Sequence, residues 1–259
     1  MNDTLPGMRR LLEVMRRLRD PESGCPWDQQ QDGKSLARYT LEEAHELVDA
    51  LESGNASSVR DELGDLLFQI VFHAQLGSER GEFDFDAIAA GIAEKLTRRH
   101  PHVFGSADAG GVESWEQIKA DERAARGAAG VLDEVPKALP ALMRSTKLGK
   151  RAATVGFDWT DAAGARAKVL EELAEVDAAQ DEGPQRVADE VGDLLLAVTS
   201  LARHLKVDAE TALRRANQRF EARFRLMEQL AVERGLALAQ LSPGQWDELW
   251  EEGKKHVQS

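Results

Sequence analysis

Hydrophobic side chains recur every three or four positions through much of the chain, which is the period of an amphipathic α-helix. One apolar stripe of this kind is formed by Leu63, Leu66, Leu67, Ile70, Val71 and Ala74. A second is formed by Val187, Val191, Leu194, Leu195, Val198 and Ala202. Alternating runs typical of β-strands are scarce, and the aromatic residues that strands favour make up only 5% of the sequence. The pattern therefore predicts an all-α fold.

Helix-boundary signals separate each stripe from a helix that precedes it. In the first half, a helix is expected to open at 40–41 and to end at the turn-forming residues 53–55. The stripe that follows is expected to begin at Ser58, as a helix-capping residue. In the second half, Pro184 stands where the first turn of a helix tolerates proline. Each half thus predicts an αα-hairpin, in which a short turn joins two helices.

Both predicted hairpins carry the same acidic signature, L-E-E-x-x-E followed by D-E-x-G-D-L-L. Its acidic residues in the first half are Glu42, Glu43, Glu46, Asp61, Glu62 and Asp65. In the second half they are Glu171, Glu172, Glu175, Asp189, Glu190 and Asp193. The copies are offset by 128 to 129 positions, which indicates duplication of a whole domain because solenoid repeats are much shorter. We therefore expect two domains, residues 1–128 and 136–259, separated by a stretch rich in glycine and proline.

The spacing of the acidic residues predicts a divalent metal site in each hairpin. Residues three or four apart share one helix face, so Glu43 and Glu46 project together, as do Glu62 and Asp65 on the next helix. The corresponding residues of the second half are Glu172, Glu175, Glu190 and Asp193. Carboxylate oxygens are the ligands that Mg²⁺ prefers, and without a cation their repulsion would destabilise the hairpin. Glu42 and Glu171 lie about 100° around their helices and are expected at the rim.

A di-iron carboxylate bundle is the main alternative for the metal, because such bundles use Glu-x-x-His on facing helices. Glu42 and His45 have this spacing. However, Ala174 replaces the histidine in the second copy, and aspartates occupy the matching positions of the other two helices. Iron is therefore disfavoured.

A glycine recurs inside the second helix of each hairpin, as Gly64 and Gly192. Glycine in a helix costs about 1 kcal/mol relative to alanine. A repeated one predicts either close approach of another helix or room for a ligand.

The composition limits which binding partners and which cellular compartment can be expected. The chain has 46 acidic and 33 basic residues, and its net charge of −13 argues against binding to a nucleic acid polymer. A small phosphate ligand stays possible, since bound metal ions reverse the local charge. The single cysteine, Cys25, excludes an internal disulfide and fits a reducing compartment. With no apolar run near the ~18 residues of a membrane span and no signal core in residues 1–20, we expect a cytoplasmic protein that does not bind membranes.

Basic and aromatic residues follow each hairpin. The first half carries Lys95, Arg98, Arg99, His100, His102, Trp115 and Lys119, and the second carries Arg214, Arg215, Asn217, Arg219, Arg223, Trp250 and Lys254. Arginine binds phosphate oxygens and tryptophan stacks on bases, but the same residues also suit a salt-bridged helix with a tryptophan packed at its end. Trp27 and Trp159 precede the hairpins, in loops expected to cap them. The sequence has no glycine-rich phosphate loop and no Ser-His-Asp pattern, so hydrolysis would require a metal-activated water.

Taken together, these strings resemble the MazG family of nucleoside triphosphate pyrophosphohydrolases. The resemblance rests on G-C-P-W-D at 24–28, Y-T-L-E-E at 39–43, E-L-G-D-L-L-F-Q at 62–69, R-R-H-P-H-V-F at 98–104 and V-G-F-D-W at 155–159. It implies two MazG-type domains in tandem and a homodimer. It also implies Mg²⁺-dependent cleavage of (d)NTPs, ATP among them, to a nucleoside monophosphate and pyrophosphate. In both halves the four acidic residues described above would hold the metal.

The resemblance further implies that the C-terminal domain is the main catalytic one. There Lys168, Arg219, Arg223 and Trp250 match positions expected to contact the nucleotide. Arg219 stands where relatives often carry lysine, which puts the geometry of that contact in question. Either Glu171 or Glu175 would orient or deprotonate the attacking water. The expected role is house-cleaning of the nucleotide pool. Two alternatives stay open: a nucleotide-binding regulatory module without turnover, and a pyrophosphatase restricted to dUTP, dCTP or phosphoribosyl-ATP.

Overall fold

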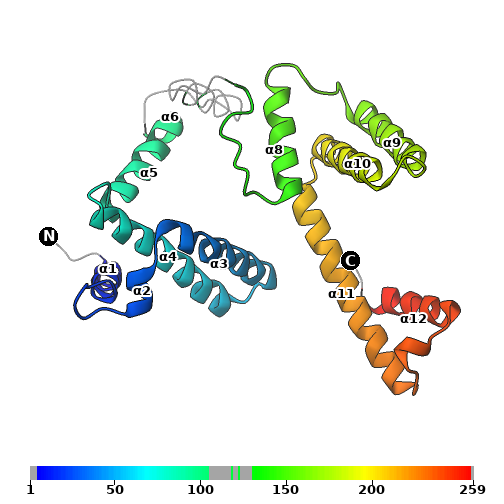
Figure 1. Cartoon of the computed structure of the whole chain (residues 1–259), viewed down its shortest axis with the longest axis horizontal. Coiled ribbons are helices and arrows are strands. Elements are labelled where there is room, and N and C mark those ends of the chain that lie inside the picture. Colours follow the sequence, from blue (N-terminus) through cyan, green and yellow to red (C-terminus); the bar gives the residue numbers. More distant parts are fainter. Residues whose placement is uncertain (1–4, 105–117, 119–121, 123–129, 258–259) are drawn as a thin grey trace. The chain divides into compact units, whose positions relative to one another are not determined.

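The described residues fold into helices, most of which are joined by short connections (Figure 1). The computed structural model describes residues 5–104, 118, 122 and 130–257, and no strand occurs among them. The all-α prediction is therefore confirmed. None of the described helices combines the length and the apolar character needed to cross a membrane.

Two compact units make up the chain, Met1–Ala120 and Asp121–Ser259. Each unit contains one of the acidic hairpins. The domain limits predicted at 128 and 136 fall partly outside the described residues and stay a prediction.

The first unit is built around the hairpin of α3 and α4. Its helices are α1 (Pro6–Leu18), α2 (Pro26–Gln30), α3 (Gly33–Ser53), α4 (Ala56–Glu79), α5 (Phe85–Arg99) and α6 (Pro101–Phe104). α3 packs along α4, and α1 packs against the same helix. Their apolar faces meet in a core formed by Met15, Leu36, Val71, Phe72 and Leu76. Phe72 has no exposed surface, so this core is filled at its centre.

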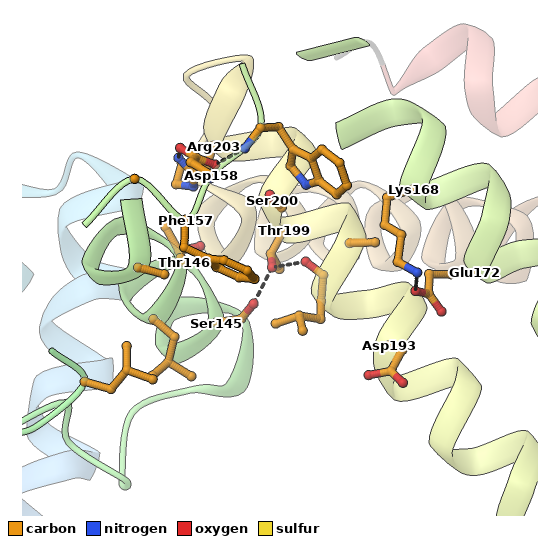
Figure 2. A pocket seen from close by; sticks show the side chains of 18 residues that line it. Ser145, Thr146, Phe157, Asp158, Lys168, Glu172, Asp193, Thr199, Ser200 and Arg203 are labelled. Carbon is orange, nitrogen blue, oxygen red and sulfur yellow. Dashed lines mark hydrogen bonds and ion pairs between the residues drawn. The ribbon is translucent and has the colours of Figure 1, made fainter. Parts of the chain in front are cut away.

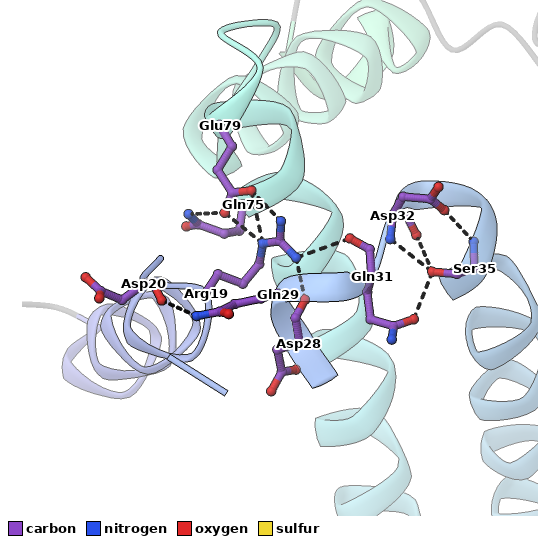
Figure 3. Close-up of polar contacts among 9 residues, drawn as sticks. All are labelled: Arg19, Asp20, Asp28, Gln29, Gln31, Asp32, Ser35, Gln75 and Glu79. Atoms are coloured by element: carbon purple, nitrogen blue, oxygen red, sulfur yellow. Dashed lines mark hydrogen bonds and ion pairs between the residues drawn. The ribbon is translucent and has the colours of Figure 1, made fainter. Parts of the chain in front are cut away.

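A largely buried arginine ties α1 to α4 and to the segment around α2 (Figure 3). Arg19 lies just after α1 and forms a two-pronged ion pair with Glu79, with Nη2–Oε2 and Nε–Oε1 distances of 2.6 and 2.8 Å. Its Nη1 donates to the backbone oxygens of Asp28 and Gln31. The hydrogen bond from Arg19 also lowers the pKa of Glu79. This network holds the segment around α2 beside α4.

The second unit repeats the hairpin and adds a longer helical pair. Its elements are α8 (Ala141–Ala153), α9 (Ala162–Ala179), α10 (Pro184–His204), α11 (Ala209–Glu233), the 3₁₀ turn η1 (Leu238–Gln240) and α12 (Pro243–His256). α9 packs along α10, and α8 packs against α10. α11 and α12 form a further pair with a core of its own, centred on Met227, Ala231 and Leu249.

The start of α3 differs from the sequence prediction. The helix begins at Gly33 rather than at 40–41. The reason is a capping box at Asp32, whose Oδ1 accepts hydrogen bonds from the backbone N–H groups of Lys34 and Ser35 at 2.8 and 2.7 Å. These bonds satisfy donors that a helix start would otherwise leave unpaired, so the helix extends by two turns.

Local capping interactions also set the other helix boundaries that were predicted. α4 begins at Ala56 rather than at Ser58, because Asn55 caps it by accepting a hydrogen bond from the Ser57 N–H at 3.0 Å. The prediction that the preceding helix ends at 53–55 is confirmed, with Gly54 in the left-handed conformation at φ 71°. The placement of Pro184 in the first turn of its helix is also confirmed.

Candidate functional site

Three carboxylates of the second hairpin come together between α9 and α10. Glu172 and Glu175 on α9 and Glu190 on α10 each place one oxygen within 4.8 Å of the others. Glu172 and Glu190 are only 4% and 2% exposed, whereas Glu175 is exposed at the edge. Asp193, one turn after Glu190, lines the adjacent cavity together with Glu172 (Figure 2). The hairpin thus brings together three of the four acidic residues that were predicted from their spacing, and the fourth, Asp193, lies along the adjacent cavity.

Each buried carboxylate has a cation one helical turn away. Lys168 Nζ lies 2.7 Å from Glu172 Oε1 and 2.7 Å from Glu171 Oε1. Arg186 forms an ion pair with Glu190 in the same i,i+4 arrangement. The hydrogen bonds to Glu171 and then to Glu172 raise the pKa of Lys168, which stays protonated. Sequence reasoning missed Arg186, although its four-residue spacing from Glu190 is the usual signal for such a pair.

Even with these two cations, the cluster carries a net negative charge and lacks a hydrogen-bond donor for one of its oxygens. Glu172 Oε2 is buried, and the described residues give it no hydrogen-bond partner. Burial, followed by the negative charges of Glu172 and Glu190, raises the pKa of Glu175. Buried polar oxygens in folded proteins are normally satisfied. A hard divalent cation would satisfy this oxygen and relieve the repulsion, so the residues present fit a metal site.

The first hairpin also gathers three of its four predicted acidic residues, but here Asp65 belongs to the cluster and Glu46 does not. Glu43, Glu62 and Asp65 place one oxygen each within 4.8 Å of the others. Within the described parts of the chain, no lysine or arginine pairs with these three. Burial and then the Asp65 charge raise the pKa of Glu43, while burial and then the Glu46 charge raise that of Glu62.

The repeat explains why the first cluster lacks the two cations of the second. At the positions that correspond to Lys168 and Arg186, the first half carries Tyr39 and Ser58. The two clusters therefore have two equivalent glutamates in common and differ in the positive charge beside them.

The glycines of the two signatures border open space. A Cβ atom built on Gly64 or on Gly192 would meet no atom within 4 Å. Of the two interpretations of the sequence, close approach of another helix is not seen among the described residues. The structure instead shows open space at both glycines.

The basic and aromatic residues expected to contact the nucleotide are distributed over two places. Lys168 lies at the acidic cluster, as described above. Arg223 instead lies over the ring of Trp250, with its Cζ 5.7 Å from the ring centroid, and Trp250 packs on Phe220 between α11 and α12. No hydrogen bond or ion pair within the described ranges joins Arg219, Arg223 or Trp250 to the acidic residues of α9 and α10. Their role as nucleotide contacts stays a prediction, and Trp115 and Lys119 lie outside the described residues.

A cavity of about 670 Å³ adjoins the second cluster (Figure 2). α8, the segment 156–159 and α10 form its walls, and Lys168, Glu172 and Asp193 lie along it. Trp159, expected to cap the hairpin, belongs to this lining. No pattern in the sequence indicates the cavity, because it depends on how α8, α10 and the segment 156–159 pack against one another.

Comparison with known proteins identifies the repeat. The MazG nucleotide pyrophosphohydrolase domain matches residues 31–104 and again residues 162–225. The chain is 48% identical over 256 residues to the nucleoside triphosphate pyrophosphohydrolase of Escherichia coli K12, covering 95% of this chain and 96% of that protein. It is 42% identical over 244 residues to the nucleoside triphosphate pyrophosphohydrolase/pyrophosphatase MazG of Thermotoga maritima, covering 94% of each. A third relative, the nucleoside triphosphate pyrophosphohydrolase of Mycobacterium tuberculosis, is 35% identical over 153 residues, which cover 57% of this chain and 46% of that protein. With two family domains, each holding one acidic hairpin, the chain belongs to the MazG nucleotide pyrophosphohydrolase family.

Proposed function

We propose that the chain hydrolyses nucleoside and deoxynucleoside triphosphates to the monophosphates and pyrophosphate in a Mg²⁺-dependent reaction, with the α9–α10 hairpin as the main catalytic centre. One observation carries the assignment to this hairpin. The buried carboxylate of Glu172 has one oxygen held by Lys168 and the other without a hydrogen-bond partner among the described residues. Membership of the family supports the reaction class, and house-cleaning of the nucleotide pool is the corresponding cellular role.

The acidic residues of each hairpin would hold Mg²⁺. In the second hairpin these are Glu172, Glu175, Glu190 and Asp193, and in the first they are Glu43, Glu46, Glu62 and Asp65. When bound, Mg²⁺ would offset the charge of the triphosphate and lower the pKa of a bound water.

Lys168 and Arg186 supply the fixed positive charge of the second site. Both are held one turn from a buried glutamate, so their side chains are oriented before a ligand arrives. An ammonium and a guanidinium in this position bind phosphate oxygens and stabilise the charge that develops on a departing pyrophosphate. Tyr39 and Ser58, at the corresponding places in the first hairpin, carry no positive charge, which favours the second hairpin as the catalytic one.

Two carboxylates are candidates for positioning the attacking water. Glu171 is exposed and accepts a hydrogen bond from Lys168 at 2.7 Å. Glu175 lies against Glu172 and Glu190 without a cation partner in the described structure. Either can accept a proton from water, and single Glu→Gln variants of the two separate them by their effect on kcat.

A homodimer is also part of the proposal. The α9–α10 hairpin exposes apolar side chains that its own unit leaves uncovered, each about half exposed: Leu170, Leu173, Leu195 and Leu196. Burying such side chains is favourable by about 25 cal/mol per Å², which supports association of two copies through this face. Light scattering coupled to gel filtration is expected to give twice the 28.5 kDa mass of the chain.

Product analysis tests the proposed reaction directly. The purified protein is incubated with each NTP and dNTP, with Mg²⁺ or with EDTA, and the products are separated by ion-exchange chromatography. We expect monophosphate plus pyrophosphate, lost with EDTA. Diphosphate plus phosphate would show that a different bond is cleaved. Thermal stabilisation by nucleotide without product would favour a binding module, and turnover of dUTP, dCTP or phosphoribosyl-ATP alone would favour a narrow pyrophosphatase.

Matched variants assign the reaction to a hairpin. Glu175→Gln should abolish turnover with the fold intact, while Glu46→Gln changes the corresponding residue of the first hairpin and measures its contribution. Glu221→Gln, an exposed glutamate on α11, serves as the control for loss of one surface charge. Near-normal turnover by Glu175→Gln would overturn the assignment to the second hairpin.

A further inference from the structure

We propose that the first hairpin retains a divalent cation in the absence of nucleotide, and that the side-chain oxygen of Gln69 is one of the ligands of this cation. The inference rests on the proposed function only in placing divalent cations at the acidic hairpins. It adds a ligand that the acidic signature does not contain. It also separates the two hairpins, because the cation of the first would hold α3 to α4 whether or not a substrate is present.

Gln69 is a buried polar residue whose oxygen has no partner. It belongs to α4 and is only 4% exposed. Its Oε1 atom is buried, and the described residues offer it no hydrogen-bond donor. Buried polar side chains of folded proteins are normally hydrogen-bonded, and leaving one unpaired is costly. An oxygen in this situation requires either a cation or a donor that does not come from the described residues.

The position of Gln69 on α4 directs its side chain to the acidic cluster. Gln69 follows Asp65 by one turn and Glu62 by two. Around the helix axis it lies between them, about 40° from Asp65 and about 20° from Glu62. Side chains on a helix lean toward its N-terminus, which is the direction in which these two acidic residues lie. Glu43 reaches the same cluster from α3. One face of α4 therefore brings two carboxylates and an amide toward the carboxylate of the other helix.

Three carboxylates and one amide oxygen suit a hard divalent cation. The oxygens of Glu43, Glu62 and Asp65 lie within 4.8 Å of one another, so a single ion can contact all three. Mg²⁺ and Ca²⁺ bind carboxylate oxygens, and Ca²⁺ also takes the carbonyl oxygens of amides. A bound water would satisfy Gln69 but would leave the repulsion among the carboxylates. A cation satisfies the amide oxygen and removes that repulsion at the same time.

The second hairpin is less suited to hold a cation by itself. α4 and α10 run in the same register through the signature, so Ala197 stands at the place of Gln69 and offers no side-chain oxygen. Lys168 and Arg186 also bring two positive charges to the second cluster. These charges repel a cation, and the negative charge of a triphosphate would offset them. The second cluster is therefore expected to bind its cation together with the phosphate ligand.

Three positions of the repeat differ in the same sense. At each of them the first copy has either an additional oxygen or no positive charge where the second has the reverse. The pairs are Gln69 and Ala197, Tyr39 and Lys168, and Ser58 and Arg186. Because the three positions lie on both helices of the hairpin, they favour cation retention by the first copy more strongly than any one of them alone.

A cation at this place would join the two helices of the first hairpin beside their core. Glu43 belongs to α3, whereas Glu62, Asp65 and Gln69 belong to α4. Phe72 follows Gln69 by three residues and fills the centre of that core, whereas Ser200, its equivalent in the second unit, lines the cavity. Removal of the cation is therefore expected to loosen the packing of α3 against α4.

Binding of Mn²⁺ to the full-length protein without nucleotide tests the inference. Mn²⁺ prefers the same oxygen ligands as Mg²⁺, and electron paramagnetic resonance distinguishes its bound and free forms. We expect a tightly bound ion in the wild type that Glu172→Gln keeps and Glu62→Gln loses. Gln69→Met should weaken its binding by about tenfold or more. Gln69→Glu keeps the oxygen and adds a charge, so it should bind the ion at least as tightly as the wild type.

Gln75→Met is the matched control, because it makes the same change on α4 away from the cluster and should leave the Mn²⁺ affinity unchanged. Circular dichroism verifies that each variant is folded. Unchanged affinity in folded Gln69→Met, or equal weakening by Gln69→Met and Gln69→Glu, would overturn the inference. A tight ion that is lost in Glu172→Gln but kept in Glu62→Gln would do the same. If Gln69→Met does not fold, weaker binding in Gln69→Glu still overturns the inference.

Hydrogen exchange provides a readout of the structural role. Without nucleotide, Mn²⁺ should slow exchange in peptides from α3 and α4 more than in peptides from α9 and α10. Equal slowing in both hairpins would contradict the inference. A tight ion at the first hairpin without any NTP turnover would support the inference and refute the proposed function. Normal turnover with no effect of Gln69→Met would do the opposite, so the two fail separately.

Discussion

Neutralising one carboxylate of the first hairpin is predicted to stabilise it, provided that no divalent cation is present. Glu43 shares a cluster with Glu62 and Asp65 in which the oxygens lie within 4.8 Å of one another. The described residues place no cation against the three. Glu43→Gln keeps the shape of the side chain and removes its repulsion with both Glu62 and Asp65.

The magnitude follows from the distances. Unit charges about 4 Å apart repel by about 1 kcal/mol in water and about 4 kcal/mol at an effective dielectric constant of 20. Asp65 is exposed and Glu43 is partly so, which places each interaction near the lower value. Glu43→Gln removes two such repulsions, although its amide does not keep every hydrogen bond of the carboxylate. The predicted gain in the free energy of unfolding in EDTA is therefore about 1 to 2 kcal/mol. Mg²⁺ should reverse the order, since at about a hundred times its Kd a ligand stabilises by ~2.7 kcal/mol and the variant has lost a ligand oxygen.

The pH dependence has a definite sign. Burial and the neighbouring charges raise the pKa of Glu43 in the folded protein. A raised carboxyl pKa means that the folded state binds protons more tightly than the unfolded state, so the destabilisation is present at neutral pH and is relieved as pH falls through the folded pKa. In EDTA the advantage of Glu43→Gln should therefore shrink as pH falls from 7 through the raised pKa of folded Glu43.

Hydrogen exchange measured by mass spectrometry gives the required local free energies, because peptides from α3 and α4 report on the hairpin alone. The rates are corrected for intrinsic exchange at each pH, with and without Mg²⁺. Glu42→Gln, on the same helix but outside the cluster, is the control and should show less than about half of the effect. Faster exchange in Glu43→Gln than in wild type in EDTA, or a gain that persists in saturating Mg²⁺, would refute the reasoning.

Three further changes probe other parts of the structure. Lys168→Met removes the cation beside Glu172 and should lower kcat/KM for NTPs by about tenfold or more in steady-state assays; an unchanged value would remove Lys168 from the site. Phe72→Ala should destabilise the first unit by about 3 to 5 kcal/mol, measured as lost exchange protection in α4, and a loss below about 1 kcal/mol would mean that its core is not packed as described. Asp158→Asn should release Arg203 and lower the stability of the second unit, measured as lost exchange protection at the end of α10. Because the pKa of folded Asp158 is lowered, its stabilisation is present above the unfolded pKa of about 3.9 and lost as pH falls further, so the stability difference between wild type and variant should disappear in strong acid and be largest at pH 7.

The hairpins could be predicted from the sequence because they depend on local periodicity. Apolar residues three and four apart, with acidic residues at the edge of the stripe, specify the helices and the face that they present to each other. The starts of α3 and α4 could not be placed as well, since several residues near each start were able to cap. Asp32 and Asn55 cap the helices, and only their backbone geometry distinguishes them from Thr40 and Ser58.

The candidate site was predictable to the same extent. Glu172, Glu175 and Glu190 meet because their spacing fixes their faces once the hairpin closes. The relation of Arg223 and Trp250 to them could not be predicted, because it depends on the packing of a separate helical pair, in which those two residues contact each other.

Phe72 and Ser200 occupy equivalent positions of the two copies, 128 residues apart as Glu62 and Glu190 are, and their tolerance to substitution is expected to differ. Phe72 is enclosed by its neighbours, so a substitution there destabilises the first unit. Ser200 faces open volume, and a replacement alters the shape of that volume while the packing around Phe72 is left intact. Point changes at this position of the duplicated chain are therefore expected to accumulate in the second copy, where they cost little stability, and to be rare in the first copy.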